Sequence, residues 1–266
     1  MAKREGWKGW DTYAPFYDWE NARTLGRQDV PFWTQIGRSI KGRVLELGCG
    51  TGRISLPLAR AGVRLFGVDR SEPMLHRAAK RARSLKVAPA PARARRRKLP
   101  LLRADIRALP FLDASFSAVI APYGLLQSLL SDRDLTATLD AVARIVKPGG
   151  VFGLDLVPDV PNWKEYGQRI QMRGKAGKGT HLTLLESVRQ DRKRRLTTFE
   201  QTYIERRGKE TREHRFDLTF RTLPIATMRR RLEKAGFDVD LVLGDYQGGP
   251  WDERADVWII LARRRL

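Results

Sequence analysis

The chain has 266 residues, of which 42% are hydrophobic and 30% charged, enough to bury one large domain or one domain with an insert. Its single cysteine, Cys49, excludes an intramolecular disulfide and a zinc centre built from cysteines. The N-terminus lacks the apolar segment of a signal peptide, and the longest apolar stretch, residues 118–130, is too short to span a bilayer. We therefore expect a cytoplasmic protein with no membrane partner and no metal site.

Aromatic residues crowd the start of the chain. They include Tyr13, Phe16 and Tyr17, and Pro15 is suited to the first turn of a helix. Aromatic residues at helical spacing more often pack inside a protein than touch a ligand. The pattern predicts helical structure in residues 1–40.

Residues 44–52 read Val-Leu-Glu-Leu-Gly-Cys-Gly-Thr-Gly and form the most informative segment. The apolar start predicts a buried parallel strand, and residues 53–61 predict a helix. The alternate glycines allow a sharp turn and the close approach of a ligand to the main chain. Open α/β sheets bind ligands at such strand ends. Because Arg53 stands where the dinucleotide fingerprint has glycine, that motif is not present.

Two side chains of this segment need separate comment. Glu46 lies within the apolar strand, where a buried carboxylate is costly unless it is paired. We therefore expect Glu46 to lie near a cationic ligand. Cys49 fits the loop as a small residue, and we expect no nucleophilic role for it.

Two of the strands that follow lead to an aspartate. Residues 64–68 end in Asp69, and residues 99–103, broken by Pro100, lead to Asp105. A carboxylate at the tip of the second strand can accept hydrogen bonds from both hydroxyls of a ribose. An aspartate at a strand end is also a common helix N-cap. A helix and two more strands are predicted at residues 73–85, 116–120 and 151–156.

Basic residues are concentrated before the third strand. Residues 88–98 are of low complexity and end in the run Arg-Ala-Arg-Arg-Arg-Lys at 93–98. With a net charge of +21, this run could neutralise phosphates and bind RNA or DNA. No aromatic residue is interleaved to stack on bases, and an arginine-rich composition alone also explains the charge.

The composition changes after the fifth strand. Residues 158–179 are rich in glycine, proline and lysine, and we expect them to be irregular. Three alternating stretches then predict a small antiparallel insert with a hairpin turn at residues 206–209. These stretches are residues 180–188, 195–206 and 210–223. A helix that Gly236 terminates and two last strands are predicted at residues 225–234, 237–243 and 255–262.

The acidic-x-Gly-x-Gly-x-Gly pattern that begins at Glu46 resembles motif I of the class I S-adenosylmethionine-dependent methyltransferases. Asp69, Asp105 and the Val-Lys-Pro-Gly-Gly turn before strand five follow in the order typical of that family. The resemblance is strong in residues 43–156 and looser elsewhere. It implies an α/β fold with a Rossmann-like, seven-stranded, mostly parallel sheet flanked by helices, and a small antiparallel β insert after strand five. It also implies S-adenosyl-L-methionine as the cofactor.

The resemblance assigns residues to this cofactor. It implies that Asp69 binds the ribose, that Asp105 accepts the adenine amino group, and that Ile106 packs against the adenine ring and offers its amide. The family's Tyr-Ala-x-x-Tyr-Asp segment, here residues 13–18, folds over the cofactor, which places Tyr17 at the methionine end or the substrate. The expected cofactor-binding set is Tyr17, Glu46, Gly48, Cys49, Gly50, Gly52, Arg53, Asp69, Arg70, Met74, Asp105, Ile106 and Ala121.

The expected organisation has four parts. Residues 1–40 form a helical lid, and residues 41–157 form the cofactor-binding core. Residues 158–223 form an insert that covers the acceptor site, as in small-molecule members of the family, and residues 224–266 complete the core sheet. Residues 244–251 resemble the Gly-Asp-Tyr-x-Gly stretch of bacterial small-molecule and sugar N-methyltransferases.

The sequence leaves the general base open. Tyr17, Asp155 and His214 are candidates, and the other two histidines have no better claim. The loop at residues 121–124 reads Ala-Pro-Tyr-Gly and lacks the polar side chain with which amino-methyltransferases of nucleobases hold their target. This departure weakens the case for methylation of a nucleobase.

Three functions follow from the sequence. The first is methyl transfer by in-line displacement to N or O of a small-molecule acceptor, by a monomer or homodimer. The second is an RNA or ribosome-associated methyltransferase that uses the basic residues 93–98. The third is a regulatory protein that binds the cofactor without turnover.

Overall fold

The computed structural model describes residues 9–24, 28–83, 99–158, 165–255 and 257–266. The chain forms two compact units, and each is described by itself. The core unit comprises Arg27–Leu126, Ser131–Pro158 and Leu223–Leu266. The insert unit comprises the described residues of Met1–Gly26, Gln127–Leu130 and Asp159–Thr222. The basic run at residues 93–98 lies outside the described residues.

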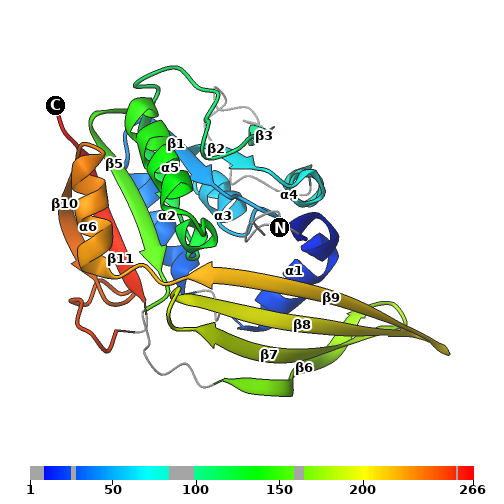
Figure 1. Cartoon of the computed structure of the whole chain (residues 1–266). Helices are drawn as coiled ribbons and strands as arrows, with labels where there is room; N and C mark the ends of the chain where they lie inside the picture. Colours follow the sequence, from blue (N-terminus) through cyan, green and yellow to red (C-terminus); the bar gives the residue numbers. More distant parts are fainter. Residues whose placement is uncertain (1–8, 25–27, 84–98, 159–164, 256) are drawn as a thin grey trace. The chain divides into compact units, whose positions relative to one another are not determined.

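One sheet runs through the core unit. Its strands are β1 (Arg43–Leu47), β2 (Arg64–Asp69), β3 (Leu101–Arg103), β4 (Phe116–Ala121), β5 (Val146–Leu156), β10 (Phe237–Leu243) and β11 (Trp258–Arg264). Their order in the seven-stranded sheet is β10-β11-β5-β4-β1-β2-β3 (Figure 1). The pairings among β1 to β5 are parallel, whereas β11 pairs antiparallel with β5 and with β10. The predicted Rossmann-like, mostly parallel sheet is therefore confirmed.

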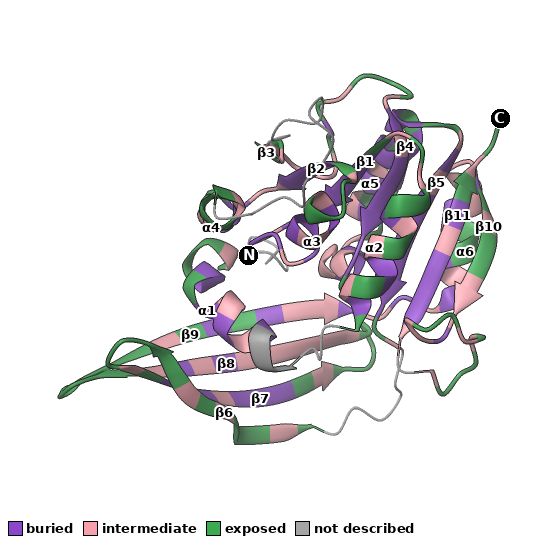
Figure 2. Ribbon diagram, turned by 180° about the vertical axis from the view of Figure 1, so that it is seen from behind, coloured by how far each residue is buried: buried purple, intermediate pink, exposed green. Residues whose placement is uncertain are grey.

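Helices cover both faces of this sheet. They are α2 (Asp29–Ser39), α3 (Ser55–Arg60), α4 (Glu72–Arg83), α5 (Asp132–Ile145) and α6 (Ile225–Lys234), with a 3₁₀ turn η1 at Leu125–Ser128. Figure 1 shows α5 and α6 in front of the sheet and α2 behind it. On the α2 side, Trp33 is fully buried in a cluster with Leu58, Val44 and Ile120. Figure 2 shows that burial is concentrated in the central strands.

Local sequence explains where these helices begin and end. The hydroxyl of Ser131 accepts a hydrogen bond from the amide of Asp134 (3.1 Å), so Ser131 caps the N-terminus of α5. Gly236 follows α6 with a φ of +89°, a conformation that glycine adopts without steric cost. The predicted bounds of α6 match the structure.

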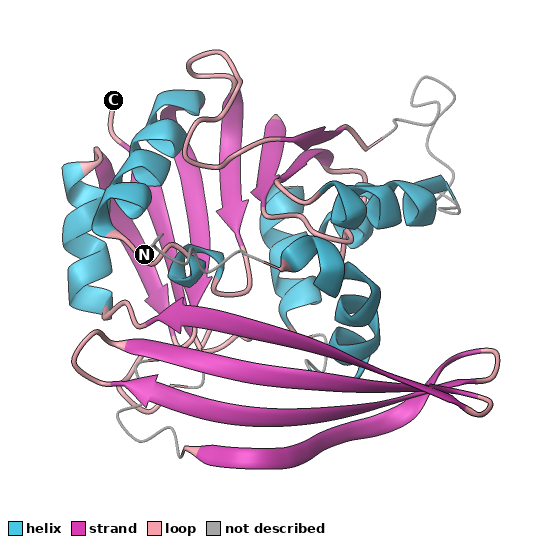
Figure 3. Ribbon diagram, turned by 45° about the vertical axis from the view of Figure 1, so that its right-hand side comes forward, coloured by secondary structure: helices cyan, strands magenta, loops and turns pink. Residues whose placement is uncertain are grey.

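The insert unit pairs an N-terminal helix with an antiparallel sheet. The helix is α1 (Trp10–Thr24), and the strands are β6 (Tyr166–Gly177), β7 (Thr180–Asp191), β8 (Leu196–Arg207) and β9 (Glu210–Arg221), in that order across the sheet (Figure 3). Aromatic rings connect the helix to the sheet. The ring centroid of Phe16 lies 4.5 Å from that of Tyr203, and the ring centroid of Tyr13 lies 5.3 Å from that of Phe216. The indole of Trp19 donates a hydrogen bond to the carbonyl of Lys175 (3.1 Å).

The sequence prediction for the first part of the insert is wrong. Residues expected to be irregular form the edge strand β6, which pairs antiparallel with β7. Most side chains of β6 are exposed, so the strand lacks the alternation of apolar and polar residues that marks a half-buried strand. An edge strand gains its backbone hydrogen bonds from one neighbour and requires no such pattern.

The expected N-terminal segment of residues 1–40 contributes to both units. Its first helix, α1, belongs to the insert unit, and its second helix, α2, belongs to the core unit. Among the described helices, none is long and apolar enough to cross a membrane.

Candidate cofactor site and active site

The glycine loop after β1 has a backbone that requires glycine. Gly48, Gly50 and Gly52 have φ values of +59°, +51° and +82°. A Cβ atom on Gly52 would also lie 2.9 Å from Cγ of Leu56. The amide of Cys49 donates to the carbonyl of Val68 (2.9 Å), which holds the loop against β2. Both the backbone conformation of this loop and its packing against Leu56 therefore require glycine.

Asp69 at the end of β2 joins this loop to the start of α4. Its Oδ2 accepts a hydrogen bond from the amide of Gly50 (2.8 Å), and its Oδ1 accepts one from the amide of Ser71 (2.8 Å). The helix-capping interpretation of Asp69 is wrong, because the side chain that accepts from the first turn of α4 is the hydroxyl of Ser71, which bonds the amide of Met74 (3.4 Å). A carboxylate oxygen can accept more than one hydrogen bond, so these bonds do not prevent Asp69 from accepting a ribose hydroxyl.

Glu46 is buried, with 3% of its surface exposed, and accepts a hydrogen bond from the hydroxyl of Ser55. Burial raises the pKa of Glu46 to about 8. The bond from Ser55 and the charge of Arg53 act in the opposite direction, and Asp69 and Asp29 add to the rise. A cation bound at this edge would favour the ionised form of Glu46.

We expect Glu46→Gln to stabilise the cofactor-free protein at pH 8. A carboxyl group whose pKa rises from 4.5 to about 8 on folding lowers the free energy of unfolding as the pH rises through that window. The glutamine variant avoids this loss, which is on the order of 4 kcal/mol at pH 8, and it differs less from the natural protein at pH 5. Urea unfolding at both pH values measures the difference. A glutamine variant that is less stable at pH 8 contradicts the assignment.

A buried ion pair connects α2 to the glycine loop. The Arg53 guanidinium contacts both carboxylate oxygens of Asp29, with Nη2–Oδ2 and Nη1–Oδ1 distances of 2.6 and 2.8 Å. The two side chains are only 14% and 5% exposed. The Arg53 guanidinium also lies 5.0 Å from the centre of the Tyr123 ring, in the loop after β4. Three segments thus meet at the carboxyl ends of β1 and β4.

Asp155 near the end of β5 is 1% exposed and holds two loops together. Its Oδ1 accepts a hydrogen bond from the amide of Gly124 (2.7 Å), and its Oδ2 accepts one from the hydroxyl of Tyr246 (2.9 Å). Burial raises the pKa of Asp155 to about 6, and these two bonds limit the rise. Asp155 is therefore mostly ionised at neutral pH.

The Asp105 carboxylate after β3 is held by arginines. Arg107 contacts it through Nε–Oδ1 (3.1 Å) and Nη2–Oδ2 (2.8 Å), and Arg70 approaches Oδ2 at 3.4 Å. Burial acts to raise the pKa of Asp105, but the hydrogen bonds from Arg107 hold it below its usual value. Arg107 also contacts Asp134 of α5 (3.2 Å). Arg107 is therefore held on two sides and fixes the position of the Asp105 carboxylate, which the sequence assigns to the adenine amino group.

Most of the predicted residues lie in the core unit, at or next to the carboxyl ends of β1 to β4. Cys49 is buried, and burial raises the pKa of its thiol, so it is unsuited to act as a nucleophile. Met74 and Ala121 are buried, whereas Ile106 is half-buried. Tyr17 lies in the insert unit, where its ring contacts Trp10 and Tyr13. His214 belongs to the same unit and approaches Glu205 at 3.1 Å.

Sequence reasoning missed Asp29, Arg107 and the link between Tyr246 and Asp155. Tyr246 lies in the Gly-Asp-Tyr-x-Gly stretch, which was its only signal. Among the described residues, no group of three His, Cys, Asp or Glu side chains is placed to hold a metal ion.

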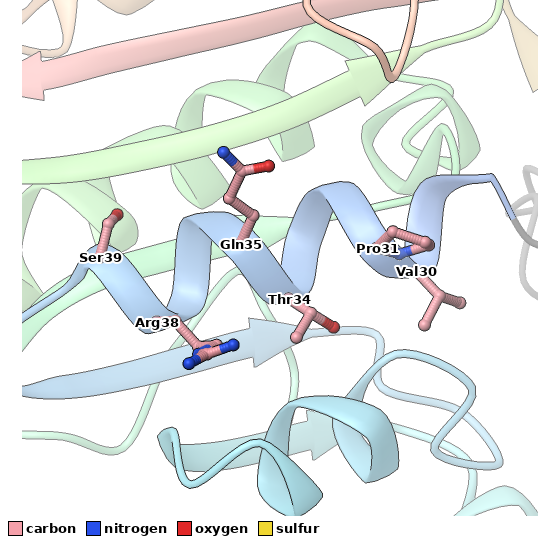
Figure 4. Close-up of a pocket in the computed structure, with 6 residues that line it drawn as sticks. All are labelled: Val30, Pro31, Thr34, Gln35, Arg38 and Ser39. Carbon is pink, nitrogen blue, oxygen red and sulfur yellow. The ribbon is translucent and has the colours of Figure 1, made fainter.

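A pocket lies along α2 (Figure 4). Its lining contains one charged residue, Arg38, and no acid. The lining residues are Val30, Pro31, Thr34, Gln35, Arg38 and Ser39. Of these residues, Val30 also packs against the core cluster that contains Trp33.

Comparisons with known proteins agree with this geometry. A family model described as a methyltransferase domain matches residues 44–150. The putative methyltransferase YqeM of Bacillus subtilis (strain 168) is 30% identical over 145 residues, which are 54% of this chain and 50% of that protein. The cypemycin N-terminal methyltransferase of Streptomyces sp is 27% identical over 234 residues, 88% of each chain. The solved structure of the sugar N-methyltransferase KedS8 from Streptoalloteichus sp ATCC 53650 has a TM-score of 0.72 at 19% identity, covering 96% of this chain and 93% of that one.

The methyltransferase-domain model includes the glycine loop, Asp69 and Asp105, and these comparisons support a class I S-adenosylmethionine-dependent methyltransferase with S-adenosyl-L-methionine as the cofactor. The chain spans about half the length of YqeM. At 19% identity, the likeness to KedS8 concerns the fold.

Proposed function

We propose that this protein transfers the methyl group of S-adenosyl-L-methionine to an amine nitrogen of a small-molecule acceptor. The observation that carries the proposal is the junction of the glycine loop and β2, where Asp69 binds the amide of Gly50. The cypemycin N-terminal methyltransferase, which aligns over 88% of both chains, supports nitrogen rather than oxygen as the acceptor atom.

We assign the parts of the cofactor to the carboxyl edge of the core sheet. Asp69 binds the ribose, and Asp105, held by Arg107, faces the adenine amino group. The glycine loop approaches the methionine portion, and the Glu46 carboxylate lies behind that loop. The bound cofactor supplies an already activated methyl group, so the protein has mainly to align the acceptor and exclude water.

Asp155 and Tyr246 are suited to orient the acceptor amine. Because the Tyr246 hydroxyl donates its proton to Asp155 (2.9 Å), its oxygen keeps lone pairs that accept an N–H of the amine. Such a bond directs the nitrogen lone pair towards the methyl carbon. A new N–C bond forms as the C–S bond breaks, and the nitrogen then loses a proton to Asp155 or to solvent. Asp155 is thus a positioning residue and the candidate proton acceptor.

We expect Asp155→Asn and Tyr246→Phe each to lower kcat by on the order of tenfold to a hundredfold, because the acceptor loses its alignment. Cofactor affinity should stay near that of the natural protein in both variants. In the natural protein, kcat should fall as the pH drops below about 6, where Asp155 becomes protonated. Steady-state kinetics and calorimetric titration with cofactor measure these effects. Asp240→Asn is the matched control, since Asp240 pairs with Arg263 on the surface of β10 and β11.

One labelling experiment tests the proposed acceptor. The protein is incubated with S-adenosylmethionine that carries a radiolabelled methyl group and with a fractionated cell extract. Label in basic small molecules supports the proposal, and label at oxygen atoms shows that the acceptor atom is wrong. The Asp69→Ala variant is the control for transfer that does not depend on this site.

The high net charge of +21 favours RNA as a second candidate acceptor. Label recovered in RNA, together with binding that weakens steeply with salt, identifies that function. Cofactor binding without label in any fraction identifies the regulatory protein without turnover.

A further inference from the structure

The loop between β10 and β11 contains a turn that a carboxylate holds together. The Oδ1 atom of Asp245 accepts hydrogen bonds from the amides of Gln247 and Gly249, both at 2.8 Å. An aspartate that accepts from main-chain amides shortly after itself fixes a turn locally. The amide of Gly244 also donates to the carbonyl of Gly249 (3.0 Å). The path of the backbone on both sides of residue 246 is therefore set within this loop.

The backbone of Gly249 lies directly against the Asp245 carboxylate. A Cβ atom on Gly249 would overlap Oδ2 of Asp245 and would lie 3.0 Å from its Cγ. A side chain at position 249 would thus push the carboxylate away from the amides that donate to it. Gln247 and Gly248 are exposed, so water replaces the carboxylate as a partner of this turn once the carboxylate moves.

The turn presents the side chain of Tyr246. This residue stands between Asp245 and Gln247, so the bonds of the turn set the direction in which its side chain leaves the backbone. The Tyr246 hydroxyl donates to Oδ2 of Asp155 (2.9 Å), and its ring centroid lies 5.7 Å from that of Phe32 on α2. The backbone of the turn and the ring of Phe32 therefore both guide the hydroxyl to Asp155.

The charge of Asp155 depends on this hydroxyl. Asp155 is buried and accepts hydrogen bonds from the amide of Gly124 and from Tyr246. Burial raises the pKa of Asp155, and the two bonds and the charge of Arg53 oppose the rise, whereas the charge of Asp29 adds to it. Loss of the bond from Tyr246 therefore makes the ionised form of Asp155 less stable.

We propose that Asp245 is a positioning residue for methyl transfer, because it holds the Tyr246 hydroxyl on Asp155. Asp245 acts on the reaction through the backbone of the turn. Gly249 serves the same purpose, since it leaves room for the Asp245 carboxylate. This inference rests on the proposed function, in which Tyr246 and Asp155 orient the acceptor amine.

A titration of the Asp155 carboxyl in the cofactor-free full chain tests the inference. NMR of isotope-labelled aspartate carboxyl carbons follows the titration, and Asp155→Asn identifies the signal. We expect Asp245→Ala and Gly249→Ala to move the midpoint upward from about 6 by up to about one pH unit, as Tyr246→Phe does. Asp245→Asn should move it less than Asp245→Ala, because an amide oxygen still accepts from main-chain amides. A general loosening of the loop would instead admit water to Asp155 and lower the midpoint.

Asp252→Ala is the matched control in the same loop. The Oδ1 atom of Asp252 accepts from the amide of Arg254 (2.7 Å), and its side chain is 55% exposed. This variant should leave both the midpoint of Asp155 and the rate of methyl transfer unchanged. Thermal melting shows which variants fold, and calorimetric titration should give the same cofactor affinity in all of them.

Kinetics with the acceptor that the labelling experiment identifies test the same link during turnover. Asp245→Ala should lower kcat by about threefold to tenfold, as expected when one hydrogen bond is weakened. In a Tyr246→Phe background the same change should lower kcat no further, because the hydroxyl that Asp245 positions is already absent.

The results separate this inference from the proposed function. The inference is overturned if a folded Asp245→Ala or Gly249→Ala protein keeps or lowers the midpoint of Asp155. It is also overturned if Asp245→Ala lowers kcat by the same factor with and without the Tyr246 hydroxyl. An upward shift in both variants, in a protein that transfers no methyl group to an amine, keeps the link between Asp245 and Tyr246 and refutes the proposed function.

Discussion

Replacement of Asp69 by alanine is expected to weaken the binding of S-adenosyl-L-methionine by about a hundredfold. Two hydrogen bonds from ribose hydroxyls to a carboxylate are each worth about 1.5–3 kcal/mol, and both are lost. The variant also loses the 2.8 Å bond from the amide of Gly50, which holds the glycine loop. Titration calorimetry with the cofactor measures the effect.

Two further variants define what the Asp69 experiment means. Asp69→Asn keeps one acceptor oxygen and should retain part of the affinity. Asp113→Ala removes an exposed carboxylate that pairs with Arg144 and should leave cofactor binding unchanged. If the Asp69→Ala protein binds the cofactor as the natural protein does, the ribose does not lie at the end of β2.

Replacement of Asp29 by alanine is expected to lower the free energy of unfolding by about 3–5 kcal/mol, because it leaves the buried Arg53 guanidinium without its carboxylate. The two side chains are 5% and 14% exposed, so water does not easily replace the lost partner. Urea unfolding monitored by circular dichroism gives the difference.

An exposed pair of similar length is the control for Asp29. Asp113 and Arg144 also approach to 2.8 Å, but their side chains are 77% and 41% exposed, so Asp113→Ala should cost less than about 1 kcal/mol. The double variant Asp29→Leu/Arg53→Met should be more stable than Asp29→Ala, since it removes both charges. Equal losses for the buried and the exposed pair contradict this account.

The order and type of the elements follow largely from local patterns. The helix α6 and the strands β7 and β8 were predicted because their alternation or helical periodicity is present in consecutive residues. The edge strand β6 was missed because its exposed side chains carry no such pattern. Its existence depends on β7, which supplies its backbone partners.

The cofactor site shows the same difference between what local sequence patterns predict and what depends on contacts between distant residues. Asp69 and the glycine loop could be predicted because the carboxyl ends of parallel strands meet at one edge. The pairs Asp29–Arg53 and Asp155–Tyr246 join residues 24 and 91 positions apart, and no local spacing indicates them. The burial of Glu46 could be predicted from its apolar neighbours, but its hydroxyl partner Ser55 could not.

The N-terminal helix α1 and the sheet of β6 to β9 are built from opposite halves of the sequence, yet they share the aromatic contacts of Tyr13, Phe16 and Trp19. A shortened chain that begins just before α2 would lack α1 but still contain the glycine loop and Asp69. It would, however, uncover Tyr203 and Phe216, which are 0% and 8% exposed in the intact protein. Such a fragment should therefore retain the cofactor-binding segments but aggregate. The first helix is needed to keep the apolar side chains of these strands away from water.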